Sequence, residues 1–140
     1  KSEYKFMLVA VTQNGMALFH AATALKGDRT IVMAAVKQNG MVFLIASSEL
    51  RNDREIVLAA VKQNGNALDY ASSELKADRE IVMEAVKQNG VALRYAAAAL
   101  KADLDVVFEA VNQDEKARQY ALQSLNFLNA LNKRCFVDLR

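Results

Sequence analysis

The sequence contains no proline and no tryptophan, and its 140 residues include only one cysteine, one histidine and five glycines. Because Cys135 stands alone, no internal disulfide can form, which suits a reducing compartment, and we expect a cytoplasmic protein. No apolar run approaches the roughly 20 residues of a membrane-spanning helix, so no membrane span is expected. A net charge of +2 gives no strong general attraction for nucleic acid. With 53% hydrophobic residues, the chain has enough apolar material for a core.

Four of the five glycines recur at a fixed interval of 25 residues, at positions 15, 40, 65 and 90. They end the segments VTQNG, VKQNG, VKQNG and VKQNG, and a fifth copy reads VNQDE at residues 111–115. Apolar residues do not alternate, and Ala, Leu, Lys, Glu and Gln dominate, which excludes strands and favours helices. We therefore predict an all-α fold, an α-solenoid of five 25-residue antiparallel helical hairpins.

The third copy shows how one hairpin is expected to form. Asp53 is a natural N-cap for a first helix, which continues through IVLAAVKQ. That helix should stop at Asn64-Gly65, where we expect glycine to take the left-handed conformation of a C-cap. A second helix, NALDYASSELK, follows at once, and only Ala77 separates it from the next cap. Connections this short force neighbouring helices to run antiparallel.

The apolar faces predict how the hairpins pack. In the first helix of the third copy they cover roughly 200° of the helix surface, too much for one partner. These residues are Ile56, Val57, Leu58, Ala60 and Val61. The second helix has a stripe of roughly 100°, formed by Ala67, Leu68, Ala71 and Leu75, with Asn66 and Asp69 opposite. No hairpin can cover its own apolar surface, so stacking on its neighbours is required.

The repeat weakens toward the C-terminus. Asp114-Glu115 replaces Asn-Gly in the fifth copy, and Arg118 stands where the other copies have Leu or Phe. We assign residues 1–125 to the repeat array and 126–140 to a C-terminal capping helix. That helix should turn Phe127, Leu128, Leu131 and Cys135 inward. Since the chain starts at Lys1, inside a repeat, we expect it to be a fragment of a longer protein.

Three recurring strings, AVKQNG, ALxYAS and LKADRE, resemble the repeat family called domain of unknown function 4116. The resemblance covers residues 1 to about 125, is strong in copies two to four and lapses in the fifth. It implies a helical repeat of long multi-domain proteins, including effectors that Legionella-type bacteria deliver into host cells. The family brings no catalytic residues to transfer. The resemblance therefore implies a scaffold or targeting module, in the host cytosol if the protein is a secreted effector.

Candidate chemistry is sparse. The sequence has no glycine-rich phosphate loop, no metal-ligand spacing and no nucleophile paired with a base. His20 occupies the position of Ile45, Tyr70, Tyr95 and Tyr120 in the other copies, so the margin of the core explains it. We predict that the protein is no enzyme and needs no cofactor or metal.

One exchange between copies points to a binding surface. Met16, Phe19, Met41 and Leu44 occupy two positions that hold residues such as Asn66, Asp69 and Arg94 in later copies. Because these positions lie opposite the apolar stripe, stacking should not bury them, and His20 and Ile45 would widen the apolar patch. Three occupants are open: a separate protein partner, which we favour, a segment upstream of Lys1, or a second copy in a homo-oligomer.

The two edges of the array offer an alternative. Arg29, Arg54 and Arg79 share one edge with repeated acids, which cancels most of its field and disfavours nucleic acid there. The other edge carries Lys37, Gln38, Lys62, Gln63, Lys87 and Gln88, with no acid inside VKQNG. This lysine edge could hold nucleic acid or an acidic peptide. Alternatively, the lysines only stabilise helix C-termini and the glutamines tie adjacent turns together.

Overall fold

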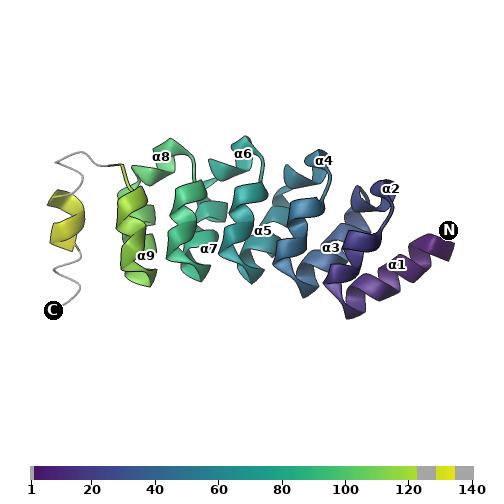
Figure 1. Ribbon diagram of the computed structural model, residues 1–140. Coiled ribbons are helices and arrows are strands. Elements are labelled where there is room, and N and C mark those ends of the chain that lie inside the picture. Colours follow the sequence, from purple (N-terminus) through teal and green to yellow (C-terminus); the bar gives the residue numbers. More distant parts are fainter. Residues whose placement is uncertain (1, 123–128, 135–140) are drawn as a thin grey trace.

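The computed structural model describes residues 2–122 and 129–134, and within these residues all regular structure is helical (Figure 1). The first helix of each copy is α1 (Ser2–Gln13), α3 (Arg29–Gln38), α5 (Arg54–Gln63), α7 (Arg79–Gln88) or α9 (Leu104–Gln113). These helices lie side by side in one row, in chain order. The predicted all-α helical repeat is confirmed.

The second half of each copy differs from the single helix that we predicted. It begins with a six-residue 3-10 helix: η1 (Gly15–His20), η2 (Gly40–Ile45), η3 (Gly65–Tyr70), η4 (Gly90–Tyr95) or η5 (Glu115–Tyr120). One-turn α-helices follow in the first four copies: α2 (Thr23–Lys26), α4 (Ser48–Arg51), α6 (Ser73–Lys76) and α8 (Ala98–Lys101). A two-residue extended break separates the two pieces, and the prediction of one continuous α-helix was wrong.

Hydrogen bonds between copies explain the break. In the third copy Ala71 and Ser72 are extended, with ψ near 158° and 159°. The Ser72 amide donates to the Arg51 carbonyl of the preceding copy over 3.1 Å, and its hydroxyl accepts from the Leu75 amide. The same bond joins the amides of Ser47, Ala97 and Leu122 to the carbonyls of Lys26, Lys76 and Lys101. A continuous helix would use these amides internally, so the break links neighbouring copies.

The glycines of the repeat have a different role from the one that we predicted. No glycine among the described residues has a positive φ, so none forms a left-handed C-cap. A Cβ on Gly40 would lie 2.5 Å from the Ala60 carbonyl oxygen of the next copy. A Cβ on Gly15 would meet the Ala35 carbonyl oxygen in the same way. Glycine is needed because the backbones of adjacent copies approach closely there.

The predicted aspartate N-caps and most of the predicted core are confirmed. Each capping aspartate accepts from a first-turn amide, as Asp53 does from the Glu55 and Ile56 amides at 3.1 and 3.2 Å. The buried faces are formed by Ile56, Val57, Ala60 and Val61 of α5 and by Ala67, Leu68, Ala71 and Leu75 of the second half, all at most 9% exposed. Leu58 is half-buried. Stacked copies thus share one continuous core.

Ion pairs connect successive copies along the arginine edge. Arg29 binds Asp53 and Glu55 of the next copy, each at 2.8 Å. Arg54 and Arg79 repeat the arrangement, with Asp78 and Glu80 and with Asp103 and Asp105 respectively. The hydrogen bond from the arginine holds the pKa of each capping aspartate (Asp53, Asp78 and Asp103) below its ordinary value of 3.8. These arginines are therefore occupied within the fold.

The C-terminal end of the row is covered. Residues 129–134 form a helix in which Leu131 is fully buried. Arg134 binds Asp105 at 2.5 Å and lies 4.5 Å from the ring centroid of Phe108, while Arg118 donates to Asn132 at 2.7 Å. Leu131 points inward as predicted, and of the capping helix predicted over residues 126–140 only residues 129–134 are described. Of the other residues expected to point inward, Phe127, Leu128 and Cys135 lie outside the described residues.

Candidate functional site

The apolar patch predicted from the sequence lies on two adjacent 3-10 helices. Met16, Phe19 and His20 come from η1, and Met41, Leu44 and Ile45 come from η2. Met16 is 45% exposed and Phe19 is 39% exposed, and His20 is also exposed. The three residues of η2 are only half-buried, so stacking covers more of this face than we predicted. The accessible centre of the patch is therefore on η1.

Local contacts fix the orientation of the patch. The Asn39 side chain caps η2 by accepting from the Met41 amide, and its Nδ2 donates to the Met16 sulfur at 3.4 Å. Arg51 donates to the carbonyl oxygens of Leu44 and Ala46 at 2.6 and 3.1 Å. The backbone of η2 is thus held at its start by Asn39 and at its end by Arg51.

The same surface is mostly polar in the later copies, with half-buried Val91 as the exception. The Asn89 side chain donates to the Asn66 carbonyl oxygen at 3.1 Å, a bond that corresponds to the Asn39 contact with Met16. Farther along, the Arg94 guanidinium lies 5.1 Å from the ring of Tyr95 and 5.6 Å from that of Tyr120. This contact bridges two copies through a cation and two aromatic rings. The array thus changes from an apolar to a polar outer surface along its length.

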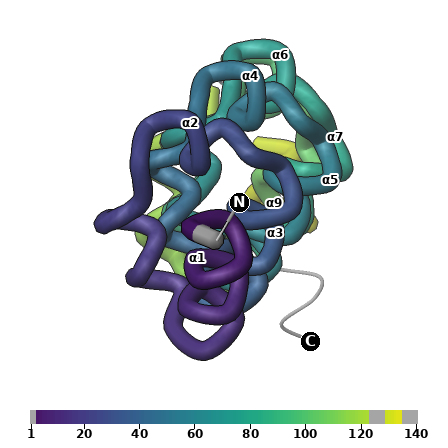
Figure 2. The backbone as a smooth tube through the Cα atoms, turned by 90° about the vertical axis from the view of Figure 1, so that its right-hand side faces the viewer, coloured from purple at the N-terminus to yellow at the C-terminus, as the bar shows by residue number. Residues whose placement is uncertain are grey.

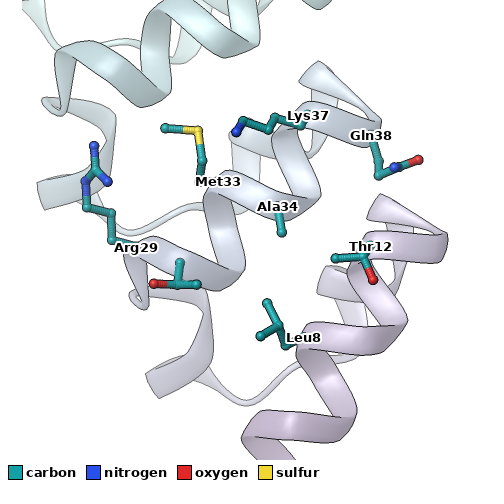
Figure 3. Close-up of a pocket in the computed structure, with 8 residues that line it drawn as sticks. Leu8, Thr12, Arg29, Met33, Ala34, Lys37 and Gln38 are labelled. Atoms are coloured by element: carbon teal, nitrogen blue, oxygen red, sulfur yellow. The ribbon is translucent and has the colours of Figure 1, made fainter.

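A hollow of about 430 Å³ lies between α1 and α3 (Figure 3). Leu8 and Met33 contribute apolar surface, whereas Thr12, Lys37 and Gln38 supply polar groups. Lys37 and Gln38 are exposed and belong to the predicted lysine edge, so the hollow is continuous with that edge. Sequence reasoning missed the hollow because it depends on how closely two neighbouring helices pack.

The lysine edge is exposed along its whole length, at Lys37, Gln38, Lys62, Gln63, Lys87 and Gln88. Lys87 lies 3.8 Å from Glu84, whereas Lys37 and Lys62 have no acidic partner among residues 2–122 and 129–134. In the same part of the chain, the three glutamine amides make no hydrogen bond, so the glutamine ladder that we considered as a structural explanation is not formed there. Their donors and acceptors face solvent.

The described residues form neither a metal-binding cluster nor a membrane-spanning helix. The described part of the chain has no cluster of three or more His, Cys, Asp or Glu side chains that could bind a metal ion. Within residues 2–122 and 129–134, no helix combines the length and hydropathy required to cross a bilayer.

Family comparison agrees with the 25-residue period seen in the structure. The model described as "Domain of unknown function (DUF4116)" matches four overlapping stretches, residues 4–51, 28–76, 53–101 and 78–126. Together they cover most of the 140-residue chain. The chain belongs to the DUF4116 family. Each match spans two consecutive hairpins, so the DUF4116 unit includes the joint between copies as well as the copies themselves.

No curated protein and no solved structure matches the chain significantly. The last DUF4116 match, residues 78–126, includes the weakened fifth copy. The family description names no ligand or reaction, so the function must be argued from the surfaces described above.

Proposed function

We propose that this DUF4116 array is a non-catalytic scaffold that binds a protein partner through the apolar patch of copies one and two. The exposure of Met16 and Phe19, at 45% and 39%, is the observation that supports the proposal. Both side chains stand where the third copy has Asn66 and Asp69, so the fold itself does not require them to be apolar. Methionine adapts its shape to a partner, and an aromatic ring supplies a large contact area.

The energy of covering the patch is large enough for the centre of a protein interface. Covering a fully exposed phenylalanine or methionine side chain contributes about 1.5–3 kcal/mol. Met16 and Phe19 are 45% and 39% exposed, so covering what remains of both contributes about 1–2.5 kcal/mol, which corresponds to about a tenfold change in affinity. The two side chains of η1, with half-buried Met41 and Leu44 beside them, can therefore anchor an interface centre. In a larger protein such an array would act as a targeting arm.

The exchange between copies supplies the test. Met16→Asn with Phe19→Asp gives copy one the outer residues of copy three, which this fold already accepts at the same positions. We expect this double variant to keep its helical circular dichroism and melting temperature. Its binding to proteins captured from the native cell should fall by at least about tenfold.

A matched control is Gln119→Asp, an exposed residue at the position of Phe19 in the fifth copy. It introduces the same carboxylate on the same surface, but in the polar copies, and should leave capture unchanged. Equal capture by the wild type and the Met16→Asn, Phe19→Asp variant would refute the proposed binding surface.

A second candidate function is an anion-binding platform on the lysine edge, for nucleic acid or an acidic peptide. Within the described residues, Lys37 and Lys62 have no acidic partner, and Lys37 also lines the hollow of about 430 Å³. These two observations favour it. Salt distinguishes the two functions. Anion binding should weaken steeply with added salt, whereas apolar docking should change little or strengthen.

A further inference from the structure

The N-terminal end of the row exposes a residue that is buried in every other copy. Figure 2 looks along the row from this end, with α1 in front. Phe6 of α1 is 72% exposed. The residues at the same position in the other first helices are completely buried, namely Ile31, Ile56, Ile81 and Val106. The side of the helix that carries Phe6 is therefore one that a neighbour normally covers.

The internal joints show which neighbour this is. Gly15, in the second half of copy one, packs against the Ala35 carbonyl of α3. Ile31 lies one turn before Ala35 on the same side of α3, so this side faces the preceding hairpin. On α1 the corresponding residues are Phe6 and Ala10. The small alanine that allows close approach of a glycine is thus present on α1 as well.

The same end has a hollow and an unused hydrogen-bond donor. The hollow measures about 380 Å³ and is lined in part by Phe6, Met7, His20, Ala22 and Leu25. In the other copies the amide at the position of Ala22 donates to a carbonyl of the preceding copy, as Ser47 does to Lys26 over 3.2 Å. The Ala22 amide meets no acceptor among the described residues. An occupant of this end must therefore offer a backbone carbonyl as well as apolar surface.

We propose that this end of α1 is a docking surface for one further hairpin of the same repeat class, joined directly to the N-terminus of α1. Such a hairpin would cover Phe6, set its glycine against Ala10 and offer a carbonyl to the Ala22 amide. A hairpin of this class supplies all three features with the geometry that the four internal joints already use. Head-to-tail docking of a second chain is obstructed, because residues 129–134 cover the other end of the row.

The docking does not depend on an ion pair between an arginine of one copy and the acids of the next. Glu3 stands at the position of Asp53, Asp78 and Asp103, but Lys5 stands where Glu55, Glu80 and Asp105 bind arginine in later copies. An arginine of the added hairpin would therefore meet one acid and one like charge. The joint between α1 and α3 has no such ion pair, because Tyr4 stands at the position of Arg29 and Thr30 at the position of Glu55. Those two helices nevertheless stack. Apolar contact and backbone bonding are therefore enough for a joint.

The test uses a chain in which a second copy of residues 53–77 replaces Lys1 and Ser2. The copy ends directly before Glu3, so the 25-residue period continues. Hydrogen exchange at the Ala22 amide should become at least about tenfold slower, because the amide gains an acceptor. In a Phe6→Trp variant, acrylamide quenching of the tryptophan should fall severalfold. Neither measurement depends on the surface formed by Met16 and Phe19. A negative result here would therefore leave the proposed function untouched.

The matched control is the same extended chain with valine in place of the added glycine that corresponds to Gly65. Its side chain would collide with the Ala10 carbonyl region, and the Ala22 amide should exchange as fast as in the natural chain. Two results would overturn the proposal. One is equal exchange in the natural and the extended chain. The other is that the chain without the added hairpin forms a concentration-dependent dimer, and that the tryptophan of its Phe6→Trp variant is already protected from acrylamide.

Discussion

At the residue scale, the repeated glycines matter because of space rather than backbone conformation. Gly40 lies against the next copy, where a Cβ would be 2.5 Å from the Ala60 oxygen and 2.8 Å from the Gln63 Cβ. Gly27, the one glycine outside the 25-residue pattern, would place a Cβ at ordinary contact distances of 3.6 Å and more. Alanine already occupies the position of Gly27 in later copies, at Ala77 and Ala102.

Gly40→Ala should therefore destabilise the protein by about 1–3 kcal/mol, because two backbones must separate. Gly27→Ala should be neutral or should stabilise by up to about 1 kcal/mol, since it reduces the freedom of the unfolded chain. Urea unfolding of both variants measures the difference. If Gly27→Ala proved the more harmful change, glycine would not be retained for close approach.

The capping aspartates also act as ion-pair partners at this scale, and this sets a pH dependence. Bonding to Arg54 lowers the pKa of Asp78 below 3.8, so the stabilisation is present above that pH and is lost as pH falls through the folded-state pKa. Asp28 caps α3 in the same way, but Tyr4 leaves it without the corresponding arginine. The two aspartates therefore separate capping from pairing.

Asp78→Asn keeps a good capping side chain and removes the charge that binds Arg54. We expect this variant to be less stable than the wild type at pH 7 and the difference to shrink below about pH 4. Asp28→Asn should show a smaller difference at pH 7. Melting temperatures measured from pH 7 to pH 3 test this, and a difference that grows toward low pH would contradict the sign.

At the element scale, the extended break in each second half restarts a helix, and the restart needs a cap. Ser72 has φ −62° and ψ 159° and accepts from the Leu75 amide through its hydroxyl. Ala97 has nearly the same backbone, with φ −61° and ψ 152°, but has no capping side chain. The short helix α8 therefore begins without this bond.

Ala97→Ser should supply the missing cap and stabilise the protein by about 0.5–1 kcal/mol. Ala98→Ser is the matched control, since its side chain lies one residue beyond the capping position and should not stabilise. Urea unfolding of the two variants is the measurement. Equal stability of the two would show that the hydroxyl does not cap α8.

The helix of residues 129–134 stabilises the end of the row mainly through fully buried Leu131. Leu131→Ala should cost about 2–5 kcal/mol locally and speed up hydrogen exchange in η5 and α9. Lys133→Ala, at an exposed position of the same helix, should leave exchange unchanged. Unaltered protection of η5 in Leu131→Ala would argue against a capping role.

At the scale of the whole molecule, the sequence predicted what depends on periodicity. The helical class, the 25-residue copies, the aspartate caps and the buried faces all follow from residues that repeat locally. The sequence-based prediction was wrong where contacts between copies determine the local conformation. The amide of Ser72 binds the preceding copy and divides the expected helix, and Gly40 faces a carbonyl of the next copy. The half-burial of Met41 and Leu44 likewise depends on the neighbouring hairpins.

The array therefore combines a regular interior with an outer surface that changes along its length. Copy one presents exposed Met16 and Phe19, whereas copies four and five present Arg94 bridged to Tyr95 and Tyr120. Because the continuous core is formed by the inward faces of the hairpins, the outer residues can vary without loss of the fold. The proposed function places binding at the apolar end, and we expect the polar end to act as a spacer.

Site-specific photo-crosslinking in the native cell tests this assignment most directly. A photoreactive phenylalanine analogue is placed at Phe19 in one chain and at Asp69 or Gln119 in others, all exposed at the same position of different copies. The account predicts an abundant adduct with one protein from position 19 and none from positions 69 and 119. Adducts of equal yield from all three positions, or from position 119 alone, would contradict it.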